Sequence, residues 1–120
     1  MQKTTLVLGA SDNKERYSNM AIKKLAAHNH PIIAVGRKKA LVGYTNIVTE
    51  FPILENIDTI TLYLSSENQK PYYNAILATN PKRIIFNPGA ENEELAKLAT
   101  SKGIQTMEAC TLVMLSTNQY

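Results

Sequence analysis

Residues 5–18 read TLVLGASDNKERYS, an apolar run that stops at Gly9 and gives way to a polar loop. A short continuous apolar run is typical of a strand that is buried on both faces of a parallel sheet. Beyond this loop the apolar spacing becomes helical, and we expect a helix from a cap at Ser18 to about Asn29. The segment therefore predicts a strand, a tight turn and a helix, the first half of a β-α-β unit.

The same alternation continues through the rest of the chain. We expect further strands at residues 31–35, 40–42, 58–64, 83–86 and 104–107, and further helices at 70–80 and 91–102. Strands that alternate with helices predict an α/β protein with a parallel sheet and right-handed crossovers. A length of 120 residues fits one domain, over residues 1–120. An apolar segment at residues 112–115 follows the last strand and has two readings, packing on the core or in a dimer interface.

Composition excludes several classes of protein. Hydrophobic residues make up 44% and charged residues 19%, which is ordinary globular usage. No apolar run approaches the roughly 20 residues that span a bilayer, and the N-terminus has no signal-peptide pattern, so we expect a cytoplasmic protein with no membrane partner. The net charge of +3 is mild and the basic residues are scattered apart from residues 37–39, which argues against nucleic acid. The single cysteine, Cys110, excludes an internal disulfide and fits a reducing compartment.

Ligands of open parallel sheets bind beyond the carboxyl ends of the strands, where the strand order reverses. In this chain those ends are the loops at residues 9–18, 36–39, 65–66 and 87–91. The candidate ligand-binding residues in them are Gly9, Ala10, Ser11, Arg16, Tyr17, Ser18, Gly36, Arg37, Lys38, Ser65, Asn87, Pro88, Gly89 and Glu91.

The first loop has the chemistry of a phosphate site. Small residues at Ala10 and Ser11 let a phosphate approach the backbone N–H groups, and Arg16 adds a planar, charged donor. The helix that follows attracts anions at its N-terminus. The loop departs from the G-x-G-x-x-G dinucleotide fingerprint, and a plain strand-to-helix turn with a surface arginine is the alternative interpretation.

The second loop bears on which nucleotide could bind. Domains that hold NAD place an acidic residue after the second strand, but here Arg37 and Lys38 follow Gly36. Two cations favour a 2′-phosphate, as in NADP, or a 3′-phosphate, as in coenzyme A (CoA). A solvated turn with loose lysines is the alternative. Four tyrosines could stack on an adenine: Tyr17, Tyr63, Tyr72 and Tyr73. Tyr17 is the best candidate, whereas Tyr63 and Tyr73 are expected to be core or packing residues.

The chain resembles the small stand-alone CoA-binding proteins, which are related to the CoA-binding domain of the succinyl-CoA synthetase α subunit. The resemblance covers essentially the whole chain and is carried by residues 9–11, 16–19, 87–92 and 109–115. It implies a three-layer, Rossmann-like fold with a central, mostly parallel sheet of five or six strands, and CoA lying across the strand ends. It also implies phosphate contacts from the first loop and adenosine contacts from the loop after the second strand. The resemblance implies binding only, without the thioester formation of the synthetase.

The sequence contains no recognisable catalytic or metal-binding set. His28 and His30 lie at the end of the first expected helix, opposite the ligand edge, and no metal-ligand spacing is present. Cys110 has two readings: a packing residue, or a reactive thiol that forms a mixed disulfide with CoA. We therefore expect a non-catalytic or regulatory module that binds CoA or an acyl-CoA. An NADP-binding oxidoreductase-type domain and a CoA-responsive module that contacts an unknown protein partner, or a second copy of the chain, are the alternatives.

Overall fold

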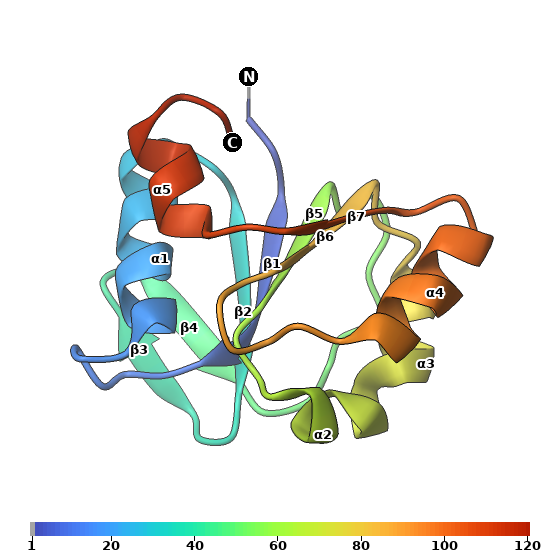
Figure 1. The fold of residues 1–120 in the computed structure, drawn as a ribbon. Helices are drawn as coiled ribbons and strands as arrows, with labels where there is room; N and C mark the ends of the chain where they lie inside the picture. Colours follow the sequence, from blue (N-terminus) through green and yellow to red (C-terminus); the bar gives the residue numbers. More distant parts are fainter. Residues whose placement is uncertain (1) are drawn as a thin grey trace.

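The computed structural model describes residues 2–120, so Met1, the first residue of the expected domain, lies outside the described residues. The strands are β1 (Thr5–Ala10), β2 (Ile32–Gly36), β3 (Ala40–Val42), β4 (Thr45–Val48), β5 (Thr59–Leu62), β6 (Arg83–Phe86) and β7 (Gln105–Glu108). The helices are α1 (Tyr17–Ala27), α2 (Ser66–Gln69), the 3-10 turn η1 (Lys70–Tyr72), α3 (Tyr73–Thr79), α4 (Glu93–Ser101) and α5 (Thr111–Ser116). They surround one seven-stranded sheet (Figure 1).

The strand order across the sheet is β3-β4-β2-β1-β5-β6-β7. All neighbouring pairs are parallel except β3 and β4, which form an antiparallel hairpin at one edge. The chain leaves the central strand β1 toward β2 and β4, then returns to the other side of β1 with β5. The order therefore reverses between β1 and β5, and a ligand crevice is expected above the carboxyl ends of these two strands.

Helices cover both faces of the sheet, as the alternating burial of β1 requires. Figure 1 shows α1 and α5 on one face and α2, α3 and α4 on the other. Leu6 and Leu8 pack in the core cluster that includes Ile76 of α3 and Leu95 of α4. Val7 points the other way, into the cluster that holds residues of α1 and α5. Burial on both faces explains why β1 is an unbroken apolar run.

The expected α/β, Rossmann-like fold class is confirmed, with differences in detail. The sheet holds β4 in addition to the six strands expected from the sequence, because residues 45–48 pair back on β3 and alternate between exposed and inward-facing side chains. The first helix starts two residues earlier than expected: Arg16 takes the cap position in place of Ser18, and Ser18 lies buried inside the helix. The second helical region starts at Ser66, one turn before Pro71, and passes through η1.

The apolar segment at residues 112–115 belongs to helix α5. Leu115 is buried against Ile22 and Leu25 of α1, which agrees with the core-packing reading of the segment, while Val113 remains exposed. The end of the chain then returns to the start of β1. The Lys3 ammonium donates a hydrogen bond to the backbone carbonyl of Tyr120 at 2.6 Å, so the segment before β1 lies beside the last residue of the chain (Figure 1). None of the helices in residues 2–120 is long and apolar enough to cross a membrane.

Candidate functional site

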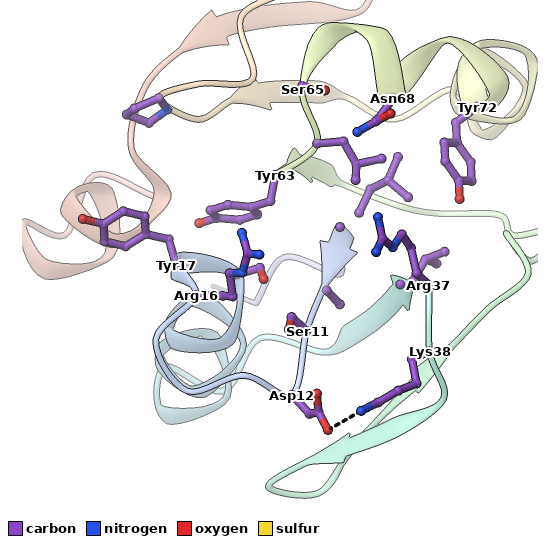
Figure 2. Close-up of a pocket in the computed structure, with 18 residues that line it drawn as sticks. Ser11, Asp12, Arg16, Tyr17, Arg37, Lys38, Tyr63, Ser65, Asn68 and Tyr72 are labelled. Carbon is purple, nitrogen blue, oxygen red and sulfur yellow. Dashed lines mark ion pairs between the residues drawn. The ribbon is translucent and has the colours of Figure 1, made fainter.

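A cavity of about 680 Å³ lies above the carboxyl ends of the central strands, where the strand order reverses (Figure 2). Its lining consists of Leu8, Gly9, Ala10, Ser11, Asp12, Arg16, Tyr17, Ser18, Val35, Gly36, Arg37, Lys38, Tyr63, Leu64, Ser65, Asn68, Tyr72 and Pro88. The lining residues come from the loops after β1, β2, β5 and β6, so the structure brings together all four loops expected at the ligand edge. The volume is in the range of small-molecule sites, about 300–1,000 Å³.

A bulge at Gly9 gives the first loop its direction. The pairing of β1 with β2 shifts register between Leu8 and Ala10, and Gly9 has a φ of 96°. A bulge bends a strand and turns the chain away from the sheet, and a positive φ favours glycine at that position. Beyond it, the Asn19 side chain donates a hydrogen bond to the Ser11 carbonyl at 3.0 Å and ties the loop to α1.

The loop is shaped further by short-range hydrogen bonds. The backbone N–H of Asn13 donates to the Ser11 hydroxyl at 3.1 Å, and the Glu15 N–H donates to the Asn13 side chain at 3.0 Å. Arg16 stands at the cap of α1, directly after this turn. Figure 2 shows the Arg16 and Tyr17 side chains on the same side of the cavity as Tyr63. A guanidinium beside the N-terminus of an eleven-residue helix is suited to an anionic ligand.

The loop after β2 adds two further cations to the cavity lining, Arg37 and Lys38. Lys38 Nζ lies 3.4 Å from a carboxylate oxygen of Asp12, and this ion pair joins the first and second loops. Both side chains are largely exposed, so the pair contributes little to stability. Gly36 is required here: a Cβ at this position would overlap with the carbonyl oxygen of Ala10.

The segment after β5 supplies a further wall of the cavity, and the residues of this segment that line the cavity carry no formal charge. Ser65, Asn68 and Tyr72 belong to it, and Figure 2 shows Tyr72 on the same side of the cavity as Arg37. Tyr72 is packed against Phe51, with ring centroids 6.3 Å apart. This packing limits how far the Tyr72 ring can turn away from the cavity.

Buried amides hold this wall against the loop after β6. The fully buried Gln69 amide donates to the carbonyl oxygens of Leu64 and Ala90, each at 2.8 Å. Its oxygen accepts from the Asn92 side chain at 2.8 Å, and Asn92 caps α4 by accepting from the Leu95 N–H. Such a network is fully satisfied and makes the wall rigid.

Three candidates lie outside the cavity lining: Asn87, Gly89 and Glu91. Asn87 is 2% exposed, and its side chain donates to the Thr61 hydroxyl at 2.6 Å and to the Leu62 carbonyl at 2.9 Å, and accepts from the Thr111 N–H at 2.9 Å. Its side chain therefore joins β5, β6 and α5. The Glu91 carboxylate accepts from the Gly89 N–H at 2.9 Å and closes the turn. Ligand contacts of these three residues stay a prediction.

The other eleven candidate residues all line the cavity, and the structure adds residues that sequence reasoning did not assign to a site. The additional lining residues are Leu8, Asp12, Val35, Tyr63, Leu64, Asn68 and Tyr72. Tyr63 was expected to pack in the core; it does pack against the cluster that holds Val7 and Ile22, but it also lines the cavity, because β5 ends at Leu62. Tyr72 was one of the tyrosines considered for stacking on an adenine, and that contact stays a prediction. Asn68 gave no signal, since its position depends on how the polypeptide winds through α2.

Tyr63 is a largely buried titratable group of the cavity lining. Burial raises the pKa of Tyr63 to about 12, so its phenol is protonated at neutral pH. Cys110, at the cap position of the short helix α5, is half-buried, and its reactivity stays a prediction. Within residues 2–120, no group of three or more His, Cys, Asp or Glu side chains is arranged to hold a metal ion.

Comparison with known proteins relates this chain to one family. The model of a protein family described as "CoA binding domain" matches residues 3–116. A crystal structure of a protein described as uncharacterised is 47% identical, with a TM-score of 0.97, and the alignment covers 100% of this chain and 99% of that one.

More distant solved structures share the fold. A hypothetical protein from Pyrococcus horikoshii OT3 is 21% identical, with a TM-score of 0.86 and coverage of 97% of this chain and 83% of that one. A protein from Thermus thermophilus is 18% identical, with a TM-score of 0.86 and coverage of 99% and 91%.

Proposed function

The chain belongs to the CoA-binding domain family, and from this membership we propose that residues 1–120 act as one domain that binds CoA or an acyl-CoA. The proposed role is that of a binding module, either non-catalytic or regulatory. The proposed site is the cavity above β1 and β5.

The distribution of charge in the cavity is the observation that carries the proposal. Its cations, Arg16, Arg37 and Lys38, come from the loops after β1 and β2, whereas the lining after β5 and β6 is uncharged. CoA has the same division, with a 3′-phosphate and a pyrophosphate at one end and a neutral pantetheine arm at the other. Phosphates placed over β1 and β2 would meet the N-terminus of α1 and the three cations.

The cations after β2 also support NADP as a second candidate ligand. Arg37 and Lys38 could accept a 2′-phosphate as readily as a 3′-phosphate, and no acidic residue follows β2 to favour the ribose of NAD. Family membership favours CoA over NADP, because it covers residues 3–116 and so includes every loop of the cavity. The two ligands are separable by experiment.

Thermal unfolding in the presence of CoA, NADPH and NAD at equal concentration tests the proposal. A ligand present at about a hundredfold its Kd adds about 2.7 kcal/mol to the stability of the folded state, which raises Tm by several degrees. We expect the largest rise in Tm with CoA and none with NAD. A rise with NADPH alone would replace CoA by NADP.

A further inference from the structure

Asp12 is the only acidic residue among the cavity-lining residues that the structure describes. It stands beside Arg16, Arg37 and Lys38 in a site that we propose for an anionic ligand. A carboxylate in such a site repels phosphate, because like charges a few ångströms apart disfavour each other. The partner of Asp12 is Lys38, whose Nζ lies 3.4 Å from a carboxylate oxygen (Figure 2). One of the three cations that would receive phosphate is therefore shared with a carboxylate of the protein itself.

The sheet places Asp12 and Lys38 opposite each other. The parallel strands β1 and β2 end with Ala10 paired to Gly36, and each charged residue stands two positions beyond that pair. The two strand ends are in close contact, since a Cβ on Gly36 would overlap with the Ala10 carbonyl oxygen. The ion pair is therefore set by the register of the sheet and not by the path of two long loops.

The first loop is shaped by groups other than the Asp12 carboxylate. The Asn13 N–H donates to the Ser11 hydroxyl, and the Asn19 side chain donates to the Ser11 carbonyl. The side chains of Lys38 and Asp12 are 75% and 44% exposed, and an exposed pair of this kind adds little to stability. The pair can therefore open at low cost, and its effect is expected on ligand binding rather than on the fold.

A phosphate on the ribose of the ligand would compete with Asp12 for the same ammonium group. The proposed function places phosphate over β1 and β2, where Lys38 is one of the cations. A lysine ammonium is a compact charge on a flexible four-carbon stem. To meet a phosphate with its full charge, it has to leave the carboxylate, and otherwise it divides its charge between two anions. Asp12 therefore weakens the attraction that Lys38 offers to a phosphate.

We propose that Asp12 competes with the ligand for Lys38 and thereby limits how much the 3′-phosphate of CoA contributes to binding. This inference rests on the proposed function and deepens it by giving Asp12 a role in specificity. Asp12 lowers the preference for ligands with a phosphate on the ribose over ligands without one, because ligands without it leave the ion pair intact.

Calorimetric titration of wild-type protein and Asp12→Asn with CoA and 3′-dephospho-CoA, which lacks the 3′-phosphate, tests this role. Asparagine keeps the size of the side chain and removes its charge. At low ionic strength, where exposed charges are least screened, CoA should bind the variant about three- to fivefold more tightly than wild type. Affinity for 3′-dephospho-CoA should stay within about twofold of wild type. Glu15→Gln, at an exposed acid of the same loop that does not line the cavity, should bind both probes as wild type does.

Lys38→Gln separates competition for the ammonium from plain repulsion of the ligand. If Asp12 acts through Lys38, the gain in CoA affinity from Asp12→Asn should disappear in the Lys38→Gln background, because no ammonium remains to compete for. Residues that act through each other give such non-additive effects in a double-mutant cycle. A gain that persists at full size in this background would mean that Asp12 repels the ligand directly, and would overturn the proposal.

The remaining outcomes separate this inference from the proposal on which it depends. Unchanged CoA affinity in Asp12→Asn, or an equal gain for both probes, would overturn the role of Asp12 while leaving CoA binding intact. Weaker CoA binding by Asp12→Asn would mean that the carboxylate contacts the ligand favourably, and would also overturn it. Failure of the wild-type protein to bind CoA would overturn the proposed function itself, and this inference with it.

Discussion

Gly9 and Tyr63 approach each other so closely that a Cβ on Gly9 would lie 3.0 Å from the backbone carbonyl carbon of Tyr63. The contact lies where the strand order reverses, between the ends of β1 and β5. It joins the loop that carries Arg16 to the end of β5, where Tyr63 follows the strand. A side chain at Gly9 would therefore affect both the stability of the fold and the shape of the cavity.

Gly9→Ala should lower the free energy of unfolding by about 2–5 kcal/mol. Part of this cost, about 1–2 kcal/mol, comes from placing alanine at a φ of 96°. The rest, about 1–3 kcal/mol, comes from the close approach to the Tyr63 backbone and the Leu64 side chain. Gly103→Ala is the matched control, because Gly103 has a φ of 81° and open space around it. Equal losses in the two variants, measured by urea unfolding, would show that the contact with Tyr63 has no energetic weight.

Arg16→Ala should weaken CoA binding about tenfold or more, because the variant loses a charge-assisted contact to phosphate. Lys14→Ala removes the same charge from the same loop, but Lys14 does not line the cavity. Calorimetric titration of both variants separates a direct contact from a general effect of charge. If the two variants weaken binding equally, Arg16 makes no specific contact.

Asn87→Ala should destabilise the protein by about 2–4 kcal/mol, because the buried Thr111 N–H and the Leu62 carbonyl lose their Asn87 partner. The exposed Asn74 in α3 offers a matched control, and Asn74→Ala should change stability by less than about 0.5 kcal/mol. Urea unfolding measures both. An effect of Asn87→Ala as small as that of the control would show that the side chain does not hold β5, β6 and α5 together.

His30 should make the protein less stable in mild acid. Burial is the main cause that lowers the pKa of His30 below its ordinary value of 6.5, with smaller contributions from nearby positive charges. The neutral ring accepts a hydrogen bond from the Lys3 N–H at 2.9 Å, which protonation would remove. The pKa of His30 is lower in the folded state than in the unfolded state. The stabilisation by the neutral ring is therefore fully present above pH 6.5 and is lost as the pH falls through the folded-state pKa.

His30→Asn should therefore flatten the pH dependence of stability between neutral pH and mild acid, measured by urea unfolding at several pH values. His28→Asn, at the neighbouring exposed histidine, is the control. A variant at His30 that keeps the full wild-type slope would assign the acid sensitivity to other groups.

The parts of the fold that were predictable from sequence are those with strong local signals. The apolar run that ends at Gly9 marks β1 because both of its faces are buried. Asn92 and the acidic residues that follow it mark α4, which the structure shows with Asn92 as its cap. In both cases the pattern along the chain and the packing in three dimensions favour the same element.

Other parts depended on contacts that no local pattern reveals. Strand β4 is short and presents only Ile47 to the core, so its pairing with β3 through the turn at Gly43 overrides a weak strand signal. Asn87 lies in a loop at the ligand edge and was expected to face the ligand, but Thr61 and Thr111 hold its side chain inward. Tyr72 reaches the cavity only because a turn of 3-10 helix at Pro71 directs it there.

Titration calorimetry of the wild-type protein with CoA, alongside NADPH and NAD, tests the proposed binding most directly. We predict saturable binding of one CoA per chain, tighter than that of NADPH and much tighter than that of NAD. Absence of saturable CoA binding would contradict the proposal, and clear binding of NADPH in its place would identify the cavity as an NADP site.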